Sequence, residues 1–273
     1  MSGIVGAGDF IPWNGGCMLI GRAVAIAPLH SHYAIQIAFG SERGIRFRPS
    51  GKVDWTEYEG VVISSRHPHM MDATGPAFDA VILVEPETRE GRALSERHKG
   101  GGITALSADA IDSIREALFS TWQARGNSSA TALSAQNVVD ALSGGVEPVV
   151  VSDERILRAI AYINGHLNTP LTLKQIAGEV FLSPSRFRHL FVQQTGTGLR
   201  PYVLWRRFLR AWEVVMHGGS LSRAAHEAGF ADSAHFTRTS HRMFGFAPSA
   251  LQVNVLPEDT PAVRLHAVAG SGR

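Results

Sequence analysis

A group of histidines near the N-terminus has the residue types and spacing that chemistry needs. His30 and His32 are separated by one residue, and in a β-strand this spacing places both imidazoles on one face. Gln36 follows on the same segment, and His69 lies later in the run RHPH. Three histidines can hold a zinc ion. Paired histidines on a strand can also line a pocket without a metal, and both interpretations stay open.

Basic residues form a second distinctive group, because they are concentrated in one half of the chain. Residues 1–151 carry twelve Lys/Arg and sixteen Asp/Glu, a net charge of −4, whereas residues 152–252 carry twelve and six, a net charge of +6. DNA presents one phosphate charge about every 1.7 Å, so basic segments are common nucleic-acid surfaces. A solvated face without a partner is the alternative.

No arrangement of residues for covalent or phosphate chemistry stands out in the sequence. The single cysteine, Cys17, lies in GGCMLI without an adjacent histidine, arginine or helix start that would activate its thiol. No Ser/His/Asp set or carboxylate pair stands out. The glycines at 100–102 are not followed by the GKS/T of a phosphate loop, which indicates a flexible loop instead.

Length and composition are those of an ordinary soluble protein. The 273 residues suggest two domains, and 44% hydrophobic with 18% charged residues argues against disorder. No apolar run reaches the roughly 18 residues of a membrane helix, and the N-terminus lacks the features of a signal peptide. With one cysteine there is no intramolecular disulfide, so we expect a cytoplasmic protein with no membrane partner.

The elements that position these side chains change type along the chain. Residues 18–84 contain short apolar runs separated by turn signals, which predicts a barrel or sandwich. Residues 88–102 are polar and glycine-rich, which predicts a loop. We expect helices from Ser107 and over 134–142, then a linker at 144–152, and only helices after it.

The segment 171–191 has the layout of a helix-turn-helix. Thr172 can cap a short first helix, and the small Ala177 lets a second helix cross it closely. Ser183 can cap the second helix, with Pro184 at its first position, where the missing N–H costs nothing.

The segment 220–244 repeats this layout. Ala225 takes the crossing position, Gly229 makes the turn, and Asp232 or Ser233 caps the second helix. Between the two units we expect a helix over residues 201–217, which spans about 25 Å. A spacer of that length can place two recognition helices in successive major-groove segments, about 34 Å apart.

Residues 153–252 resemble the DNA-binding domain of AraC/XylS-type transcription regulators. The resemblance is carried by LTLKQIA and LSPSRFRHLF, TG at 195–196, PYVLWRRFLRA, LSRAAHEAGFADSAHFTR and FGFAPSAL. Ser240 stands where an aromatic core residue is usual, so we expect looser packing of the second unit. Gln252 stands where an arginine often ends the motif.

The resemblance implies which positions face the DNA groove. An arginine there can bond bidentately to guanine O6 and N7, at about 1–3 kcal/mol of discrimination. The alternative for each of these residues is a contact with phosphate, which orients the protein on DNA but does not read the base sequence. Arg186 is less suited to reading bases than the others. Arg207 matches a connector arginine that is often structural. The implied DNA-binding residues are Ser185, Arg186, Arg188 and His189 in the first recognition helix and Ser233, Ala234, His235, Thr237 and Arg238 in the second.

The first half resembles a cupin-like β-barrel. HSHYAIQIAFG is similar to the first cupin motif and SSRHPHMMDATG to a degraded second one. The resemblance makes His30, His32, Gln36 and His69 the counterparts of cupin metal ligands. Because Gln36 stands where a glutamate is usual, the site loses a carboxylate, and we expect no metal cofactor.

A small-molecule effector, where one binds, is expected inside the barrel. Trp13 and Trp55 could stack on it or only pack in the core. The helices after the barrel have an apolar stripe that fits either a dimer contact or their own barrel, so the protein is a monomer or a homodimer. The candidate lining residues are His30, His32, Gln36, Arg46 and His69.

The expected fold is an α+β multidomain protein. A cupin-like β-barrel with trailing helices (1–143) is followed by a linker (144–152), an all-α domain with two helix-turn-helix units (153–252) and a tail (253–273). The leading hypothesis is a transcription regulator, not an enzyme, that binds promoter DNA and activates through RNA polymerase. A small molecule would shift its population between DNA-competent and incompetent arrangements. The alternatives are a metal-binding cupin enzyme fused to a DNA-binding domain and, least favoured because of Cys17, a DNA-repair methyltransferase.

Overall fold

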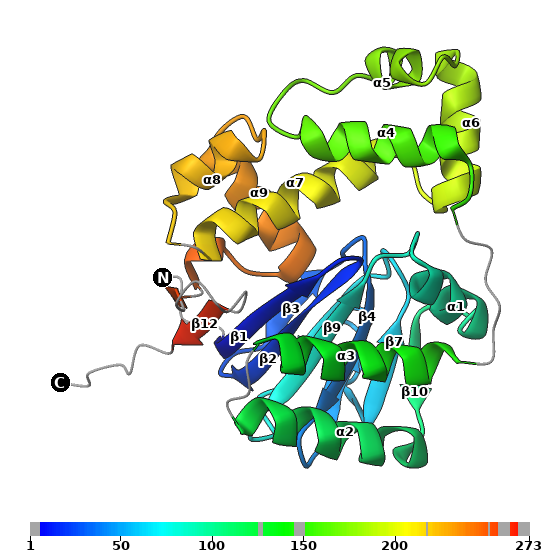
Figure 1. The fold of residues 1–273 in the computed structure, drawn as a ribbon. Coiled ribbons are helices and arrows are strands. Elements are labelled where there is room, and N and C mark those ends of the chain that lie inside the picture. The colour runs from blue at the N-terminus through cyan, green and yellow to red at the C-terminus, as the bar shows by residue number, and fades with distance from the viewer. Residues whose placement is uncertain are drawn as a thin grey trace.

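Two β-sheets with three helices form the first half of the chain, and a cluster of helices forms the second (Figure 1). The computed structural model describes residues 6–124, 128–144, 151–216, 218–250, 252–255 and 263–266. We call residues 6–144 the front domain and residues 151–250 the helical domain. No helix in the described segments is long and apolar enough to cross a bilayer.

The larger sheet is antiparallel and carries most of the front-domain core. In β4 and β9 every residue is buried, because both faces of the sheet are covered. One face packs against helices of the front domain, and the other packs in a core that includes Ile45 and Phe47 of the smaller sheet. In spatial order its strands are β10 (Ile103–Leu106), β7 (Gly60–Ile63), β4 (Ile35–Gly40), β9 (Asp79–Val84), β2 (Gly16–Ala23), β1 (Gly6–Trp13), β12 (Val263–His266) and β11 (Gln252–Val255).

The smaller sheet has the order β3 (Ala27–His30), β8 (His69–Asp72), β5 (Ile45–Arg48) and β6 (Thr56–Tyr58). Its register places His30 opposite His69. The sheet-rich front domain predicted from the sequence is therefore confirmed. The prediction of only helices after the linker was wrong for the tail, because β11 and β12 form there and β12 pairs with β1 of the front domain.

The prediction of a loop over residues 88–102 was wrong, because a helix, α1 (Arg89–Arg97), forms there. Thr88 caps it by accepting a hydrogen bond from the Gly91 backbone N–H. Ala93 and Leu94 are the buried residues that hold this mostly polar helix in place. Two apolar residues are too few to produce a recognisable helical period in the sequence.

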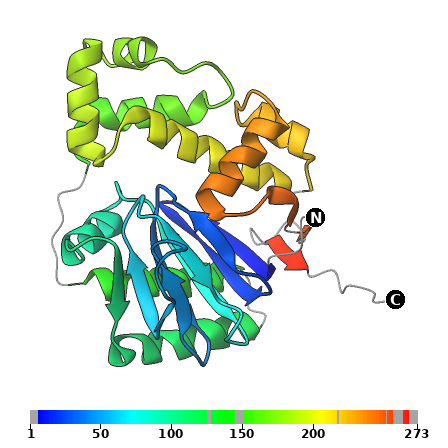
Figure 2. The same ribbon diagram turned by 180° about the vertical axis from the view of Figure 1, so that it is seen from behind.

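Helices α2 (Ala108–Gln123) and α3 (Ser128–Ser143) cover one face of the larger sheet, as Figure 2 shows from behind. Ser107 caps α2, as predicted. Ile111 and Leu118 are fully buried, and the Trp122 indole donates to Asp9 Oδ2 at 2.7 Å. Of the two alternatives for this apolar stripe, the structure has it packed on its own sheet.

The helical domain contains the elements that the sequence predicted. Thr172 and Ser183 cap the two helices of the first unit, and Ser220 and Asp232 cap those of the second. Residues 145–150, most of the predicted linker, lie outside the described residues. The helices are α4 (Glu154–Gly165), α5 (Leu173–Glu179), α6 (Pro184–Thr195), α7 (Leu199–Met216), α8 (Leu221–Glu227) and α9 (Ser233–Phe244), followed by the short η1 (Pro248–Ala250).

Ser240 does not loosen the second unit in the way the sequence suggested. Its side chain is fully buried, and its hydroxyl donates to the Phe246 carbonyl at 2.7 Å. Phe244 stacks on Phe208 of α7 with ring centroids 5.1 Å apart. A hydrogen bond to the turn after α9 therefore stands where an aromatic side chain was expected.

Candidate nucleic-acid interface

The first recognition helix, α6, presents its predicted groove residues to solvent. The Ser183 side chain accepts from the Arg186 backbone N–H and fixes the start of the helix. Phe187 and Phe191, four residues apart, are buried and anchor the opposite side. All of the predicted groove residues of α6 are exposed, namely Ser185, Arg186, Arg188 and His189.

The second recognition helix, α9, is more closely surrounded. The Asp232 side chain accepts from the His235 backbone N–H at 2.6 Å, and Phe236 is buried in the core. The His235 ring lies edge-on to Phe230, with centroids 5.2 Å apart, so it is partly held by the preceding turn. Ala234 and Arg238 are exposed, whereas Ser233, His235 and Thr237 are half-buried.

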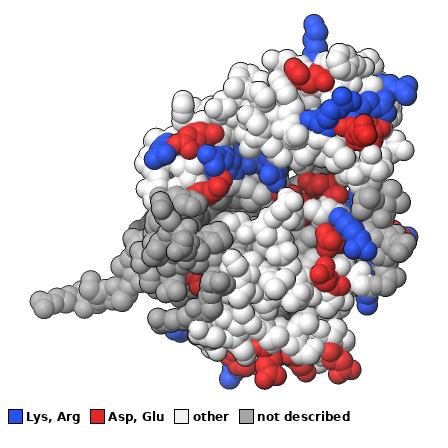
Figure 3. Space-filling view, viewed as in Figure 1, with Lys and Arg blue, Asp and Glu red and all other residues white. Residues whose placement is uncertain are grey.

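Charge pairing separates the arginines of the helical domain into two sets. Arg206 pairs with Glu85, and Arg223 pairs with Glu227. Within the described residues, the side chains of Arg188 and Arg238 have no hydrogen bond or ion pair. Figure 3 shows basic and acidic side chains side by side on the helical domain, and a mostly acidic group at the far end of the front domain. The unpaired guanidinium groups are the ones free to contact an anionic partner.

Arg207 is structural, as the resemblance implied. Its Nε donates to the Leu167 carbonyl at 2.9 Å, and one terminal nitrogen donates to the Thr169 carbonyl at 2.8 Å. The turn of the second unit is just as tightly fixed. Gly229 has φ +76°, and a Cβ at this position would lie 2.0 Å from the Leu167 oxygen. The start of the first unit and the turn of the second are thus tied together.

Three histidines of the front domain converge beneath the second unit. His30, His32 and His69 are 7%, 3% and 0% exposed, and one ring nitrogen of each lies within 4.8 Å of the others. Burial, reinforced by the neighbouring imidazoles, lowers the pKa of His30 to about 4 and that of His69 to about 2. The pKa of His32 is also lowered by burial. All three rings are therefore neutral near pH 7.

Gln36 joins this cluster and Arg46 does not. Gln36 Oε1 lies 2.8 Å from His32 Nε2. Arg46 points away, because along β5 the neighbouring Ile45 and Phe47 are buried and the side chain between them faces outward. Arg46 instead forms an ion pair with Asp72. Four of the five predicted lining residues thus come together.

Hydrogen bonds between described residues join the front domain to the helical domain at three places, and ring contacts such as Tyr33–Trp205 add to them. The Glu85 carboxylate accepts from Trp205 Nε1 at 3.1 Å and from Arg206 at 2.7 Å. Arg66 donates to Thr197, just after α6. At the other end, the Ser31 backbone N–H donates to the Arg242 carbonyl of α9 at 3.1 Å. Sequence reasoning missed Glu85, for which the only signal is an acidic residue directly after an apolar strand.

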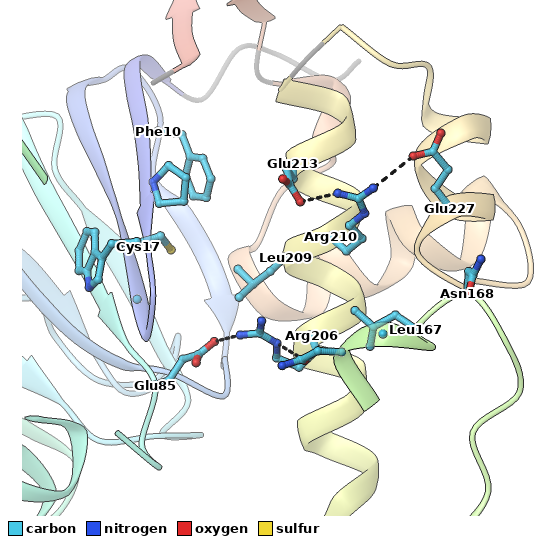
Figure 4. A pocket seen from close by; sticks show the side chains of 15 residues that line it. Phe10, Cys17, Glu85, Leu167, Asn168, Arg206, Leu209, Arg210, Glu213 and Glu227 are labelled. Atoms are coloured by element: carbon cyan, nitrogen blue, oxygen red, sulfur yellow. Dashed lines mark hydrogen bonds and ion pairs between the residues drawn. The ribbon is translucent and has the colours of Figure 1, made fainter. Parts of the chain in front are cut away.

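A cavity of about 530 Å³ lies between the domains beside the Glu85–Arg206 pair (Figure 4). Strands β1 and β2 form one wall, with Phe10 and Trp13, and α7 forms another. Arg210 reaches the cavity but is paired with Glu213 at 2.8 Å and with Glu227 at 3.7 Å. The cavity is thus at the domain boundary rather than inside the β-structure, where an effector was expected. Trp55 lies elsewhere, beneath the Arg48 guanidinium.

Cys17 also borders this cavity, but its environment opposes a nucleophilic role. The side chain is 1% exposed, and burial, with the nearby Glu85 charge, raises the pKa of the thiol far above its usual range. A thiol that stays protonated is a poor nucleophile. The structure therefore gives no support to methyltransferase chemistry at this residue.

Known proteins are similar to the helical domain in sequence. Residues 155–253 match a family model described as a helix-turn-helix domain. Over 110 residues the chain is 28% identical to the regulatory protein PocR of Salmonella typhimurium, a match that covers 40% of this chain and 36% of PocR. It is also 28% identical over 116 residues to the arabinose operon regulatory protein of Escherichia coli, covering 41% and 38%. The match thus spans little more than a third of these relatives.

Solved structures extend the similarity to the fold of both domains. An apo variant of ToxT from Vibrio cholerae strain SCE256 matches with a TM-score of 0.53 and 11% identity, over 85% of this chain and 95% of ToxT. ToxT from Vibrio cholerae O395 bound to (E)-4-(8-methylnaphthalen-1-yl)but-3-enoic acid gives the same TM-score, identity and coverage. The fold similarity to ToxT covers 85% of this chain, whereas the matching family model covers residues 155–253. Residues 155–253 of this chain are thus similar to a helix-turn-helix family and to part of the two regulatory proteins above.

Proposed function

We propose that the protein is a transcription regulator that binds promoter DNA through both helix-turn-helix units. One observation carries the proposal: Arg188 and Arg238 lie exposed on the two capped recognition helices with no acidic partner among the described residues, while Arg206, Arg210 and Arg223 are paired. Unpaired arginines on a helix that fits the major groove are suited to guanine edges and phosphates.

The front domain then has the role of sensing a small molecule. The cavity between the domains supports this role, because β1, β2 and α7 all border it. A ligand that binds there with different affinity in two domain arrangements would shift the population between them. We further propose activation through RNA polymerase in the cytoplasm, by a monomer or a homodimer.

The metal-dependent enzyme kept as the alternative has less support. Such an enzyme needs a metal site that a substrate can reach. His30, His32 and His69 are all buried, and the cavity between the domains is lined by other residues. A regulator needs no such access.

The test is binding of the full-length protein to its own upstream DNA, measured over a series of salt concentrations. Arg188→Ala and Arg238→Ala are compared with Arg223→Ala, an arginine of the same domain that is already paired with Glu227. We expect the first two variants to lose about 1–3 kcal/mol each, and the control to bind like wild type. Equal losses in all three variants, or no specific binding at low salt, would refute the proposal.

A further inference from the structure

Although the sequence led us to expect no metal cofactor, we propose that His30, His32 and His69 bind a divalent transition-metal ion. We propose further that occupancy of this site alters how the recognition helix α9 is held against the front domain. The metal site stands on the geometry of the front domain alone. Its effect on DNA binding rests on the proposed function.

The orientation of the three rings is the first argument for a metal. Each Nδ1 lies against a backbone carbonyl: His30 at 2.7 Å from Pro28, His32 at 2.8 Å from Ala34, and His69 at 2.9 Å from His67. A carbonyl can only accept, so each Nδ1 carries the proton and each Nε2 keeps its lone pair. Metal-binding histidines are held by the same kind of second hydrogen bond.

The unsatisfied nitrogens are the second argument. His69 Nε2 is buried and has no hydrogen-bond partner among the described residues, although its ring is fully enclosed. His32 Nε2 faces the carbonyl oxygen of Gln36, yet a neutral ring that donates through Nδ1 has no second proton for that oxygen. Buried polar atoms without a partner are costly, and a single cation would bind the free lone pairs of all three rings.

The separation of the ring nitrogens fits a site that closes on its ion. Metal–nitrogen bonds of about 2.0–2.1 Å in a tetrahedral site place the ligand atoms roughly 3.3 Å apart. One ring nitrogen of each histidine lies within 4.8 Å of those of the other two, so the rings must approach by up to about 1.5 Å. Imidazole ligands suit zinc, copper, nickel and iron, and Gln36 or a water would complete the set.

The segment that carries the histidines also supports the end of α9. Between His30 and His32, the Ser31 backbone N–H donates to the Arg242 carbonyl in the last turn of α9. The His32 ring lies 6.0 Å from the Phe244 ring. Gly245, which ends α9, packs so closely on Pro28 that a Cβ would lie 2.8 Å from its ring. Closure of the rings on an ion therefore displaces the surface on which α9 rests.

Metal binding is tested directly with Co²⁺, whose visible absorption reports its coordination, followed by competition with Zn²⁺. We expect one ion per chain and a binding constant more than 100-fold weaker in His69→Asn. A lost ligand should cost more than the roughly 10–100-fold for an outer-shell partner. His166→Gln, which removes an exposed histidine directly after α4, should bind like wild type. Saturable binding that His69→Asn leaves unchanged would overturn the site, as would no binding at micromolar Co²⁺.

A second variant, Gln36→Glu, addresses the case in which His69→Asn loses metal binding because it misfolds. It restores a carboxylate next to His32, so we expect it to tighten Co²⁺ binding by at least tenfold. Weaker or unchanged binding would count against the site.

The effect on α9 is measured as the DNA affinity of the full chain with and without Zn²⁺. We expect a change of about fivefold or more in wild type and none in His69→Asn. Co²⁺ binding with unchanged DNA affinity would refute the coupling and leave the metal site intact. Absence of specific DNA binding in every sample would refute the proposed function instead.

Discussion

Replacing Glu85 by glutamine should weaken the contact between the two domains. The Glu85 side chain is 6% exposed and Arg206 is 25% exposed, so their ion pair is largely shielded from water. Glutamine keeps an oxygen that can accept from Trp205 but removes the charge opposite Arg206. A hydrogen bond to a charged group contributes about 1.5–3 kcal/mol, and we expect a loss of that size in the docking free energy. This loss corresponds to a shift of roughly 10- to 150-fold toward undocked domains.

Hydrogen exchange of the backbone amides of α7 measures this shift, because the helix loses protection when the domains separate. We expect faster exchange around residues 202–208 in Glu85→Gln. The matched control is Glu96→Gln, which removes an exposed carboxylate of α1 that pairs only with Lys99 on the surface. Unchanged exchange in Glu85→Gln, or an equal change in the control, would show that the Glu85–Arg206 pair does not hold the domains together.

Three further predictions concern single residues. Gly229→Ala should destabilise the helical domain by about 1–3 kcal/mol from backbone strain, and further because the added Cβ collides with a carbonyl oxygen. The control Gly178→Ala, in open space on a helix, should be neutral or stabilising in the same denaturation series. Ser240→Ala should cost about 1 kcal/mol or more in that assay, because the partly buried Phe246 carbonyl loses its donor; a value near zero would contradict this. Burial raises the pKa of Asp79 to about 7, so its contribution to stability is present in acid and lost as the pH rises through 7. The gain in stability of Asp79→Asn over wild type should therefore be larger at pH 8 than at pH 5.5. Urea midpoints that the substitution leaves unchanged at both pH values would refute this.

Local signals in the sequence predicted the helical domain well. The caps at Thr172 and Ser183, the proline at the first position of α6 and the glycine at the turn of the second unit each act within a few residues, so their effect can be inferred from the sequence. Helix α1 was missed because Ala93 and Leu94 are its only buried apolar side chains. Ser240 was misjudged because its partner, Phe246, lies beyond the helix and is reached only through the turn.

The histidine cluster shows where such inference ends. The prediction that His30 and His32 share one face of a strand was wrong, because β3 ends at His30 and His32 lies in the segment before β4. His69 joins them through the pairing of β3 with β8, which the sequence does not specify. The orientation of each ring depends on a carbonyl two residues away, a backbone geometry that no side-chain pattern reports. Arg46 was misplaced for a related reason, because the register of β5 decides which of its residues face inward.

The three domain contacts constrain how a signal could reach DNA. Helix α7 is a single helix of 18 residues that joins both helix-turn-helix units, and Arg206 lies near its middle. Arg66 and Ser31 contact the helical domain on either side of that point, near the end of α6 and in the last turn of α9. A rotation of α7 about the Glu85 contact would move the two recognition helices in opposite directions. Because two groove segments must be occupied at once, even a small rotation would disturb binding to a two-part site. Glu85→Gln should therefore change the contribution of Arg188 and of Arg238 to DNA affinity together, and a change confined to one unit would argue against a pivot.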